Sequence, residues 1–192
     1  MSAVAKTADW IAPEDYLEGE KSSETRHEYI DGAVYAMAGA SDDHNRIAIN
    51  ITGELRERLR GKRCEAFMVD MKVKTPPTIA TVYYYPDVLV ACDATDNARN
   101  FRERPTVIFE VISPETERID RREKFFAYWQ IPTLSAYVIV EQERMALTVF
   151  RKLGSEWTSE TVEGSRAVLK LPEIGADIPL ERIYERTAVA KG

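Results

Sequence analysis

Apolar and polar residues recur along the 192-residue chain with periods that predict a series of strands and helices. Two short apolar runs flank Asp31-Gly32, a pair typical of a two-residue hairpin turn, so this segment is predicted to be a β-hairpin. Ser41 or Asp42 is suited to cap a helix that reaches about Arg60. Residues at helical spacing give this helix one face, made of His44, Ile47, Ala48, Ile51, Leu55 and Leu59.

Strand patterns dominate the middle of the chain. Residues 64–74 alternate between apolar and polar, and the apolar runs 83–91 and 106–112 predict two further strands. A helix is expected over 117–130, followed by a buried strand over 136–140. One side of the first strand is made of Phe67, Val69, Met71 and Val73, and the apolar face of the helix is made of Ile119, Phe125, Phe126 and Trp129.

The last part of the chain is expected to form an antiparallel meander and a short helix. Residues 145–150 and 157–162 alternate on either side of Gly154, and 179–186 has a helical pattern. The whole order is a hairpin, a helix, three strands, a helix, a strand and the meander. It predicts an α/β fold of the α+β kind with a mixed sheet, in which 106–140 forms a right-handed parallel crossover.

Composition limits the classes of protein that fit. A hydrophobic fraction of 44% and a charged fraction of 30% are typical of a soluble globular protein. The chain has no internal repeat, low-complexity tract or Gly/Ser-rich linker, so residues 1–192 are expected to form one domain. No apolar run approaches the roughly 20 residues of a membrane span, so no membrane partner is expected. A net charge of -6 argues against a protein that coats nucleic acid non-specifically, but allows a local basic face.

The N-terminus and the two cysteines indicate in which cellular compartment the protein is expected. The first nine residues contain no apolar stretch of the kind that a secretory signal needs, so a cytoplasmic protein is expected. Cys64 and Cys92 both lie in strand-like segments and are interpreted as reduced, buried thiols, with a disulfide as the alternative.

Two carboxylates stand out because they lie in apolar surroundings. Asp87 follows Pro86 at the start of the run Val88-Leu89-Val90-Ala91, and Glu110 lies inside the run 107–112. A carboxylate in an apolar strand is unfavourable unless it is paired, hydrogen-bonded or bound to a metal. Two of them on successive strands predict an oxygen-lined site for a hard cation such as Mg²⁺.

A third polar element follows these strands. Asp120, Lys124 and Tyr128 recur every fourth residue, so on a helix they share one stripe beside the Phe125/Trp129 face. The alternative is an exposed Asp120–Lys124 pair, which contributes a few tenths of a kcal/mol. Asp87 could equally cap a turn, and Glu110 could belong to a buried salt bridge.

The order of elements, with Pro-Asp before one strand and Glu on the next, resembles the PD-(D/E)XK nuclease superfamily. More closely, the chain is similar to the bacterial family named putative restriction endonucleases, formerly a domain of unknown function. The resemblance covers roughly residues 13–185. Its matching segments are Tyr29-Ile30-Asp31-Gly32, Ala38-Gly39-Ala40-Ser41 with His44, Tyr85-Pro86-Asp87-Val88, Glu110-Val111-Ile112-Ser113-Pro114, Asp120 with Lys124, and Tyr128.

The resemblance implies a restriction-endonuclease-like core of order α-β-β-β-α-β and a Mg²⁺-dependent nuclease that hydrolyses DNA, with Mn²⁺ as a substitute metal. Asp87, Glu110 and the carbonyl of Val111 would bind the metal. The superfamily places a lysine two residues after the acid, where this chain has Ile112. Lys124 on the next helix is the expected replacement, and it would orient the attacking water or stabilise developing charge.

Other residues are candidates for the edge of the site. His44 lies within an apolar helical face, so it is either a core histidine or a group beside the metal, and Glu54 at the margin of that face is a weaker candidate. For phosphate contact the candidates are Arg118, Arg121 and Arg122. A second basic cluster at the end of the first helix fits the helix dipole or a phosphate contact, and consists of Arg56, Arg58, Arg60, Lys62 and Arg63.

Three functions remain open on this basis. The first is a Mg²⁺-dependent DNA phosphodiesterase, and the second is a catalytically silent relative that binds nucleic acid or a partner protein, which Ile112 and the acidic net charge favour. The third is a different hydrolase with the same metal site. Many nucleases cut as dimers, and a homodimer is expected to form through the meander residues Leu147, Val149 and Trp157.

Overall fold

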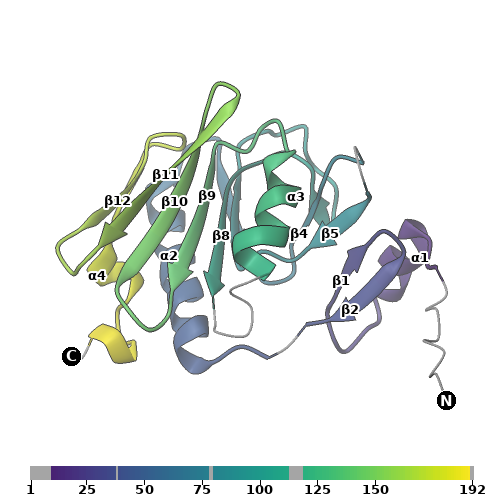
Figure 1. The fold of residues 1–192 in the computed structure, drawn as a ribbon, viewed down its shortest axis with the longest axis horizontal. Helices are drawn as coiled ribbons and strands as arrows, with labels where there is room; N and C mark the ends of the chain where they lie inside the picture. Colours follow the sequence, from purple (N-terminus) through teal and green to yellow (C-terminus); the bar gives the residue numbers. More distant parts are fainter. Residues whose placement is uncertain (1–9, 38, 78–79, 113–118, 191–192) are drawn as a thin grey trace, which may run out of the picture.

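The computed structural model describes residues 10–37, 39–77, 80–112 and 119–190, and for 119–121 it describes the backbone only. Its strands form a six-stranded sheet of order β11-β10-β9-β8-β6-β3, a five-stranded sheet of order β2-β1-β5-β4-β7 and a two-stranded sheet of β12 and β13 (Figure 1). No helix in the described ranges is long and apolar enough to cross a membrane.

The six-stranded sheet carries the central part of the fold. Its strands are β3 (Glu65–Met68), β6 (Val88–Ala91), β8 (Pro105–Ile112), β9 (Ala136–Glu141), β10 (Ala146–Leu153) and β11 (Glu156–Glu163). Only β8 and β9 pair in parallel, as the predicted crossover requires, and the other neighbours are antiparallel. The predicted strand 106–112, the strand 136–140 and the meander turning at Gly154 are therefore confirmed.

The N-terminal hairpin belongs to the five-stranded sheet. β1 (His27–Ile30) and β2 (Ala33–Ala36) pair antiparallel around Asp31 and Gly32, whose φ angles of 47° and 94° are those of a tight hairpin turn. The other strands of this sheet are β4 (Lys72–Lys74), β5 (Val82–Tyr84) and β7 (Phe101–Arg102).

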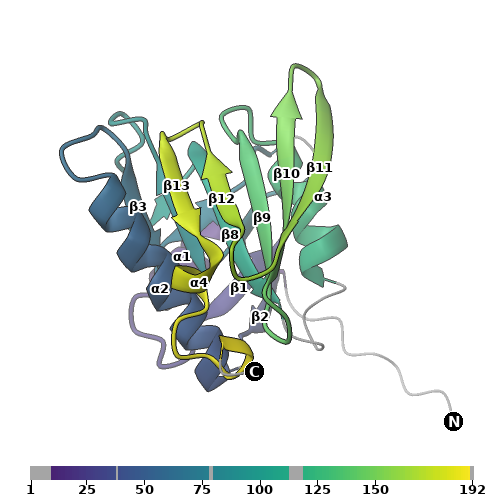
Figure 2. The same ribbon diagram turned by 90° about the vertical axis from the view of Figure 1, so that its left-hand side faces the viewer.

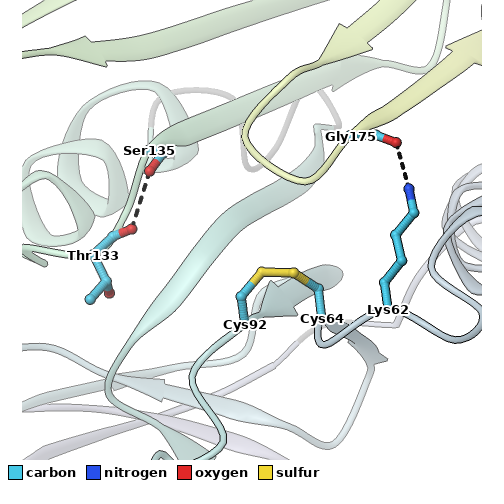
Figure 3. Close-up of a disulfide and its surroundings, with 6 residues drawn as sticks. All are labelled: Lys62, Cys64, Cys92, Thr133, Ser135 and Gly175. Atoms are coloured by element: carbon cyan, nitrogen blue, oxygen red, sulfur yellow. Dashed lines mark hydrogen bonds between the residues drawn. A yellow bond between two sulfur atoms is a disulfide. The ribbon is translucent and has the colours of Figure 1, made fainter.

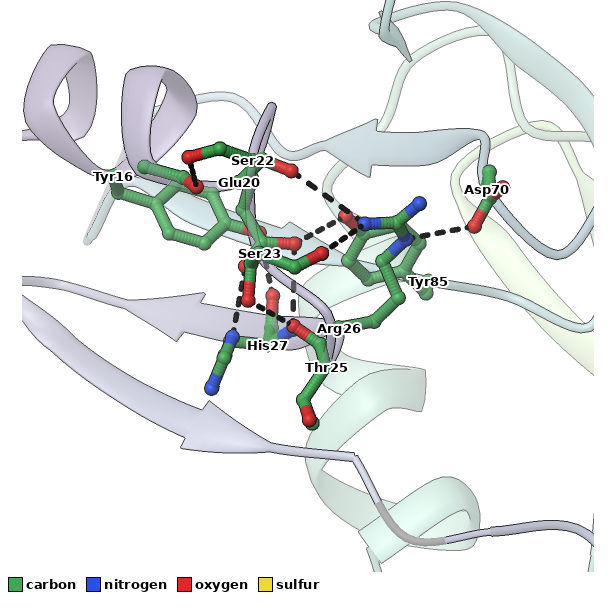
Figure 4. A network of polar contacts seen from close by, with 10 residues as sticks. Tyr16, Glu20, Ser22, Ser23, Thr25, Arg26, His27, Asp70 and Tyr85 are labelled. Carbon is green, nitrogen blue, oxygen red and sulfur yellow. Dashed lines mark hydrogen bonds and ion pairs between the residues drawn. The ribbon is translucent and has the colours of Figure 1, made fainter.

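A short helix, α1 (Pro13–Gly19), is joined to this hairpin by a polar network, in which the Tyr16 hydroxyl donates a hydrogen bond to the His27 carbonyl (Figure 4). Glu20, just after α1, accepts hydrogen bonds from the Tyr85 hydroxyl at 2.7 Å and pairs with His27 at 2.8 Å. Burial opposes ionisation of Glu20, but the hydrogen bonds from Tyr85 and His27 outweigh it and lower the pKa of this carboxyl. The network therefore holds β1 in a fixed position relative to β5.

The helix α2 (Asp42–Arg58) matches its prediction closely. The Ser41 hydroxyl accepts a hydrogen bond from the His44 amide at 3.1 Å, which is the capping contact that the sequence predicts. The predicted apolar face is buried except for His44, which is half-buried, and it packs on one side of the six-stranded sheet. Figure 2 shows α2 on this side together with β12 (Val168–Leu171), β13 (Ala176–Pro179) and α4 (Leu180–Ile183).

Two predicted strands were wrong in extent. The segment 64–74 is not one strand but two, because Val69 has a φ of 58° and the chain turns there from β3 into β4. The segment 83–91 is likewise divided by Pro86 into β5 and β6. In each case the two halves belong to different sheets. The apolar pattern runs on across the break, so it does not show that the chain passes from one sheet to the other.

The predicted helix 117–130 is present from residue 119 as a π-helical turn, η1 (Ile119–Lys124), continued by α3 (Phe125–Trp129). Its predicted apolar face was wrong at Phe126 and Trp129, which are 59% and 37% exposed, and the side chain of Ile119 lies outside the described residues. Phe125 is partly buried and packs against the core, as predicted. Lys124 and Tyr128 are buried and also meet the sheet.

The closing segment is also shorter in helix than predicted, because 179–186 contains only α4 and residues just before it form β13. The pair β12 and β13 and the helix α1 were not predicted. Leu147 and Val149 are fully buried in the protein core, so the expectation that they form a dimer interface was wrong, whereas Trp157 is partly exposed.

Cys64 and Cys92 form a disulfide, which corrects their interpretation as reduced thiols (Figure 3). They flank the antiparallel pair in which Glu65 of β3 lies opposite Ala91 of β6. Beside the disulfide, the Lys62 ammonium donates a hydrogen bond to the Gly175 carbonyl at 2.8 Å. The strand pairing, rather than the local sequence, brings the two sulfur atoms together.

Candidate active site

Antiparallel pairing of β6 and β8 brings the two predicted carboxylates to adjacent positions. Val88 lies opposite Phe109, so Asp87, one residue before β6, lies beside Glu110 and Val111 of β8. The Val111 amide donates a hydrogen bond to the Asp87 Oδ2 atom at 2.6 Å. Val111 thus contacts Asp87 through its N–H group, and the predicted role of its carbonyl as a metal ligand stays a prediction.

Glu110 is held by buried polar partners. Only 2% of this residue is exposed, and its Oε1 atom accepts a hydrogen bond from the Tyr128 hydroxyl at 3.0 Å. The Lys124 ammonium lies 3.3 Å from the same oxygen. A buried carboxylate with these two donors satisfies the requirement that a charge inside an apolar strand be compensated.

Lys124 points into the protein, so the predicted approach of this lysine to Glu110 is present in the structure. The residue is 7% exposed, and its Nζ atom lies 3.0 Å from Glu28 Oε1 as well as 3.3 Å from Glu110 Oε1. It also lies 5.6 Å from the centre of the Tyr84 ring. The alternative of a solvent-exposed helix pair does not describe this lysine.

Glu28 is a site residue that the sequence analysis missed. It lies on β1, on the opposite side of the strand from the buried Tyr29, and the Tyr85 amide donates a hydrogen bond to its Oε1 atom at 3.5 Å. The predicted hairpin began at Tyr29, so Glu28, between His27 and Tyr29, lay just outside it and had no apolar run around it to mark it. Nothing in local periodicity linked residue 28 to residue 124, because the contact joins β1 of the five-stranded sheet to the helical turn η1.

His44 lies at the edge of this group. Its Nε2 atom is 3.3 Å from Asp87 Oδ2, and both side chains are mostly buried. The helix end that carries it is fixed because the Ser41 hydroxyl bonds Gln142 at 2.6 Å, and Gln142 in turn donates to the Ile112 carbonyl at 2.8 Å. Two interpretations of His44 were open, a core histidine or a group beside the metal ligands. Its contact with Asp87 agrees better with the second.

The structure does not bring every candidate to this place. Glu54 lies ten residues beyond His44 on α2, about 15 Å along the helix axis, and it pairs with Arg58 and Arg182. Arg122 is exposed. Arg118 and the side chains of Asp120 and Arg121 lie outside the described residues.

The second basic cluster has partly structural roles. Arg58 donates to Glu54 and to the Asp177 carbonyl, and Lys62 bonds Gly175, so both stabilise the fold locally. Arg56 and Arg60 line an open groove of about 770 Å³ between α2 and the edge strand β3.

Two phenols beside the carboxylates stay neutral at ordinary pH. Burial, reinforced by the charge of Glu110, raises the pKa of the Tyr128 hydroxyl far above its usual value. Burial, with a smaller contribution from Glu28, raises the pKa of Tyr84 to about 12. Tyr128 therefore remains a hydrogen-bond donor to Glu110, and the lysine is the cation next to the carboxylates.

The carboxylates of this group are possible ligands of a hard cation such as Mg²⁺. In the described part of the chain no three His, Cys, Asp or Glu side chains gather as a preformed metal cage. Mg²⁺ often needs only one or two protein carboxylates, since water and substrate phosphate supply its other ligands. Carboxylate oxygens are the ligands that such an ion prefers, so Glu110 with either Asp87 or Glu28 would be sufficient to hold it.

The arrangement of layers is that of a nuclease-like α+β fold. A crystal structure described as "a putative nuclease belonging to DUF820" from Anabaena variabilis ATCC 29413 is similar, with a TM-score of 0.72, over 91% of this chain and 97% of that one. The sequence identity of that pair is 14%, so the likeness concerns the fold.

Sequence relatives lead from the fold to a family. The chain is 33% identical over 180 residues to the uncharacterized protein slr1290 of Synechocystis sp. (strain ATCC 27184 / PCC 6803 / Kazusa), covering 93% of both chains. It is 30% identical over 174 residues to sll1609 of the same strain, covering 88% of this chain and 97% of that one. The model of the Uma2 family, described as "Putative restriction endonuclease", matches residues 13–181. The chain belongs to this family, as the resemblance in the sequence indicated.

Proposed function

We propose that the protein is a Mg²⁺-dependent nuclease that hydrolyses phosphodiester bonds of DNA at the group formed by Glu28, Asp87, Glu110 and Lys124. Membership of a restriction-endonuclease family supports a nucleic-acid substrate. The observation that carries the proposal is the Lys124 ammonium within 3.3 Å of Glu110, because it supplies the positive charge that Ile112 cannot.

Each residue has a role that follows from its contacts. Bound Mg²⁺ would polarise the phosphate and acidify a water. Asp87 and Glu110 would hold the ion, and the Tyr128 hydroxyl fixes the orientation of Glu110. His44 and the Val111 amide fix Asp87. The Lys124 ammonium would stabilise negative charge that develops on the phosphate.

The direct test is a substrate panel with matched carboxylate variants. We expect the wild type to cleave DNA with Mg²⁺ or Mn²⁺ and to be inactive with chelator. Glu110→Gln and Asp87→Asn should each lower the rate at least about a hundredfold, equivalent to roughly 2.7 kcal/mol in the barrier. Glu156→Gln, at an exposed position of β11, is the control and should retain full activity.

The second candidate is a catalytically silent protein that binds nucleic acid or a partner through this fold. The observation in its favour is that Ile112 occupies the usual lysine position and that Lys124 is already engaged by two carboxylates. DNA binding without metal-dependent cleavage across the panel would favour this candidate. Cleavage of other phosphoesters but not of DNA would instead favour a different hydrolase.

A further inference from the structure

Lys124 connects two carboxylates that come from different sheets. Glu28 belongs to β1 in the five-stranded sheet and Glu110 to β8 in the six-stranded sheet, and the Lys124 Nζ atom lies 3.0 Å from one and 3.3 Å from the other. The three side chains are 15%, 3% and 9% exposed for Glu28, Glu110 and Lys124. The ammonium is thus the counter-charge shared by two largely buried anions.

A divalent cation that used these same two carboxylates would need the position that the ammonium occupies. A hard cation binds carboxylate oxygens at about 2.0 to 2.1 Å for Mg²⁺, closer than the ammonium sits. An ammonium and a divalent ion on the same two oxygens would lie within a few ångströms of each other, where like charges in a poorly solvated site repel strongly. A divalent ion bound to these two oxygens would therefore tend to displace the ammonium from them.

We infer that Lys124 acts as a built-in surrogate cation, which neutralises Glu28 and Glu110 in the metal-free protein and competes with the divalent ion for them. The inference rests on the proposed metal-dependent function and adds Glu28 to the cation site. Binding of the ion releases Lys124 from the two carboxylates. The released ammonium is then available to the anionic phosphate of the substrate, so metal and lysine act in sequence on the same oxygens.

If Lys124 competes with the metal ion, replacing it should change both the stability and the metal affinity of the protein. Lys124→Met removes the competitor and leaves two buried carboxylates without their shared counter-charge, which is destabilising. The vacated position should then favour a divalent ion more than it does in the wild type. The variant is expected to be less stable than the wild type in chelator and to gain more thermal stability from Mn²⁺, because a ligand that binds only the native state stabilises it.

A matched control is present in the same molecule. Lys72 is also a buried lysine, with 5% of the residue exposed, and its Nζ atom lies 4.9 Å from the centre of the Tyr85 ring. Burial lowers the pKa of Lys72, and its charge faces Glu20 rather than Glu110. Lys72→Met removes a buried ammonium of the same length without touching the proposed site.

The experiment is Mn²⁺ binding by calorimetry together with melting temperatures in chelator and in Mn²⁺, on the full chain. We expect Lys124→Met to bind Mn²⁺ at least about tenfold more tightly than the wild type and to show the larger Mn²⁺-induced rise in melting temperature. Lys72→Met should bind like the wild type. The double variant Glu28→Gln/Lys124→Met should lose most of the gain, because it lacks the second oxygen ligand. Lys124→Gln serves as a second probe if the methionine variant does not fold, and it should also bind more tightly.

The outcomes separate this inference from the function on which it rests. Equal or weaker Mn²⁺ binding by Lys124→Met and Lys124→Gln, with normal binding by the wild type, would overturn the competition while leaving a metal-dependent nuclease intact. An equal gain in Lys72→Met would overturn it too, because the effect would not belong to this site. Absence of Mn²⁺ binding in the wild type and all variants would overturn the metal-dependent function and the competition together.

Discussion

The two faces of the six-stranded sheet differ in what they pack against. One face, with α2, β12, β13 and α4, is covered by an almost wholly aliphatic cluster. The other face, toward η1, α3 and the five-stranded sheet, contains Tyr84, Tyr128 and Tyr137 and also the buried Glu110 and Lys124. The first face is mainly apolar, and its buried Glu54 pairs with Arg58 and Arg182, whereas on the second face a buried carboxylate and a buried lysine contact each other.

A single strand shows how the two faces are produced. Along β8, Val107, Phe109 and Val111 join the aliphatic cluster, while Ile108 and Ile112 join the cluster on the other face. Glu110 lies between these last two in the alternation, so strand geometry places its carboxylate on the face that carries tyrosines. The same strand thus stabilises the fold with one set of residues and supplies the candidate site with the other.

The largest effect on stability should come from the aliphatic face. Leu55 on α2 is fully buried in that cluster, so Leu55→Ala should lower the free energy of unfolding by about 2 to 5 kcal/mol. Denaturant melts measure this loss. Ile49→Ala, on the same helix but at a position 58% exposed, should change stability by less than about 0.5 kcal/mol. Similar losses in both variants would contradict the assignment of the helix face.

The tyrosine face should respond to alkaline pH through Tyr84. Tyr84 has its pKa raised from 10.0 to about 12, so between these values the folded protein holds a proton that the unfolded chain has lost. Its contribution to stability is complete below about pH 10 and is lost as the pH rises toward 12. By pH 11 this amounts to about 1 kcal/mol.

Urea melts between pH 9 and 11.5 test this response. Tyr84→Phe should flatten the fall in stability with pH, whereas the loss caused by Leu55→Ala should stay constant over the same range. An unchanged slope in Tyr84→Phe would show that the alkaline response arises elsewhere in the protein.

The smallest effects are expected on the outer side of α3. Phe126 is 59% exposed and stacks on Trp129 with ring planes 7° apart, so Phe126→Ala should change stability by less than about 0.5 kcal/mol. Tyr128→Phe, two residues away, removes a hydrogen bond to the buried Glu110 and should lower the free energy of unfolding by about 1 to 3 kcal/mol. Thermal melts of the pair that showed the reverse order would mean that the helix is rotated relative to the sheet.

The sequence predicted those parts of the fold in which local rules decide the structure. The turn at Asp31-Gly32 and the cap at Ser41 depend on neighbouring residues only, and both formed as expected. The division of 83–91 between two sheets depends on which partners lie nearby, and local apolarity could not reveal it. The face of α3 was misassigned because aromatic residues were taken as buried, whereas a lysine and a tyrosine fill the space next to Glu110.

In the candidate site, too, the sequence revealed the residues that a local pattern marks and missed the one that depends on distant partners. Asp87, Glu110 and Lys124 were identified by motif and by the unfavourable burial of charge, and these three lie in one chain of contacts with Val111 and Tyr128. Glu28 was missed because its contact with Lys124 spans 96 positions in the sequence (124 − 28 = 96) and depends on how η1 packs beside β1.

The disulfide has a topological consequence beyond its place beside β3 and β6. Between Cys64 and Cys92 the chain leaves the six-stranded sheet after β3, forms β4 and β5 in the five-stranded sheet, and returns as β6. The sulfur–sulfur bond closes this excursion into a covalent ring, and Asp87 lies within that ring, just before the chain returns as β6. Closing a loop of this length removes unfolded-chain entropy equivalent to about 3 to 4 kcal/mol. This closed loop of backbone therefore links the two sheets, and the ends of β3 and β6 stay close together even in the unfolded chain.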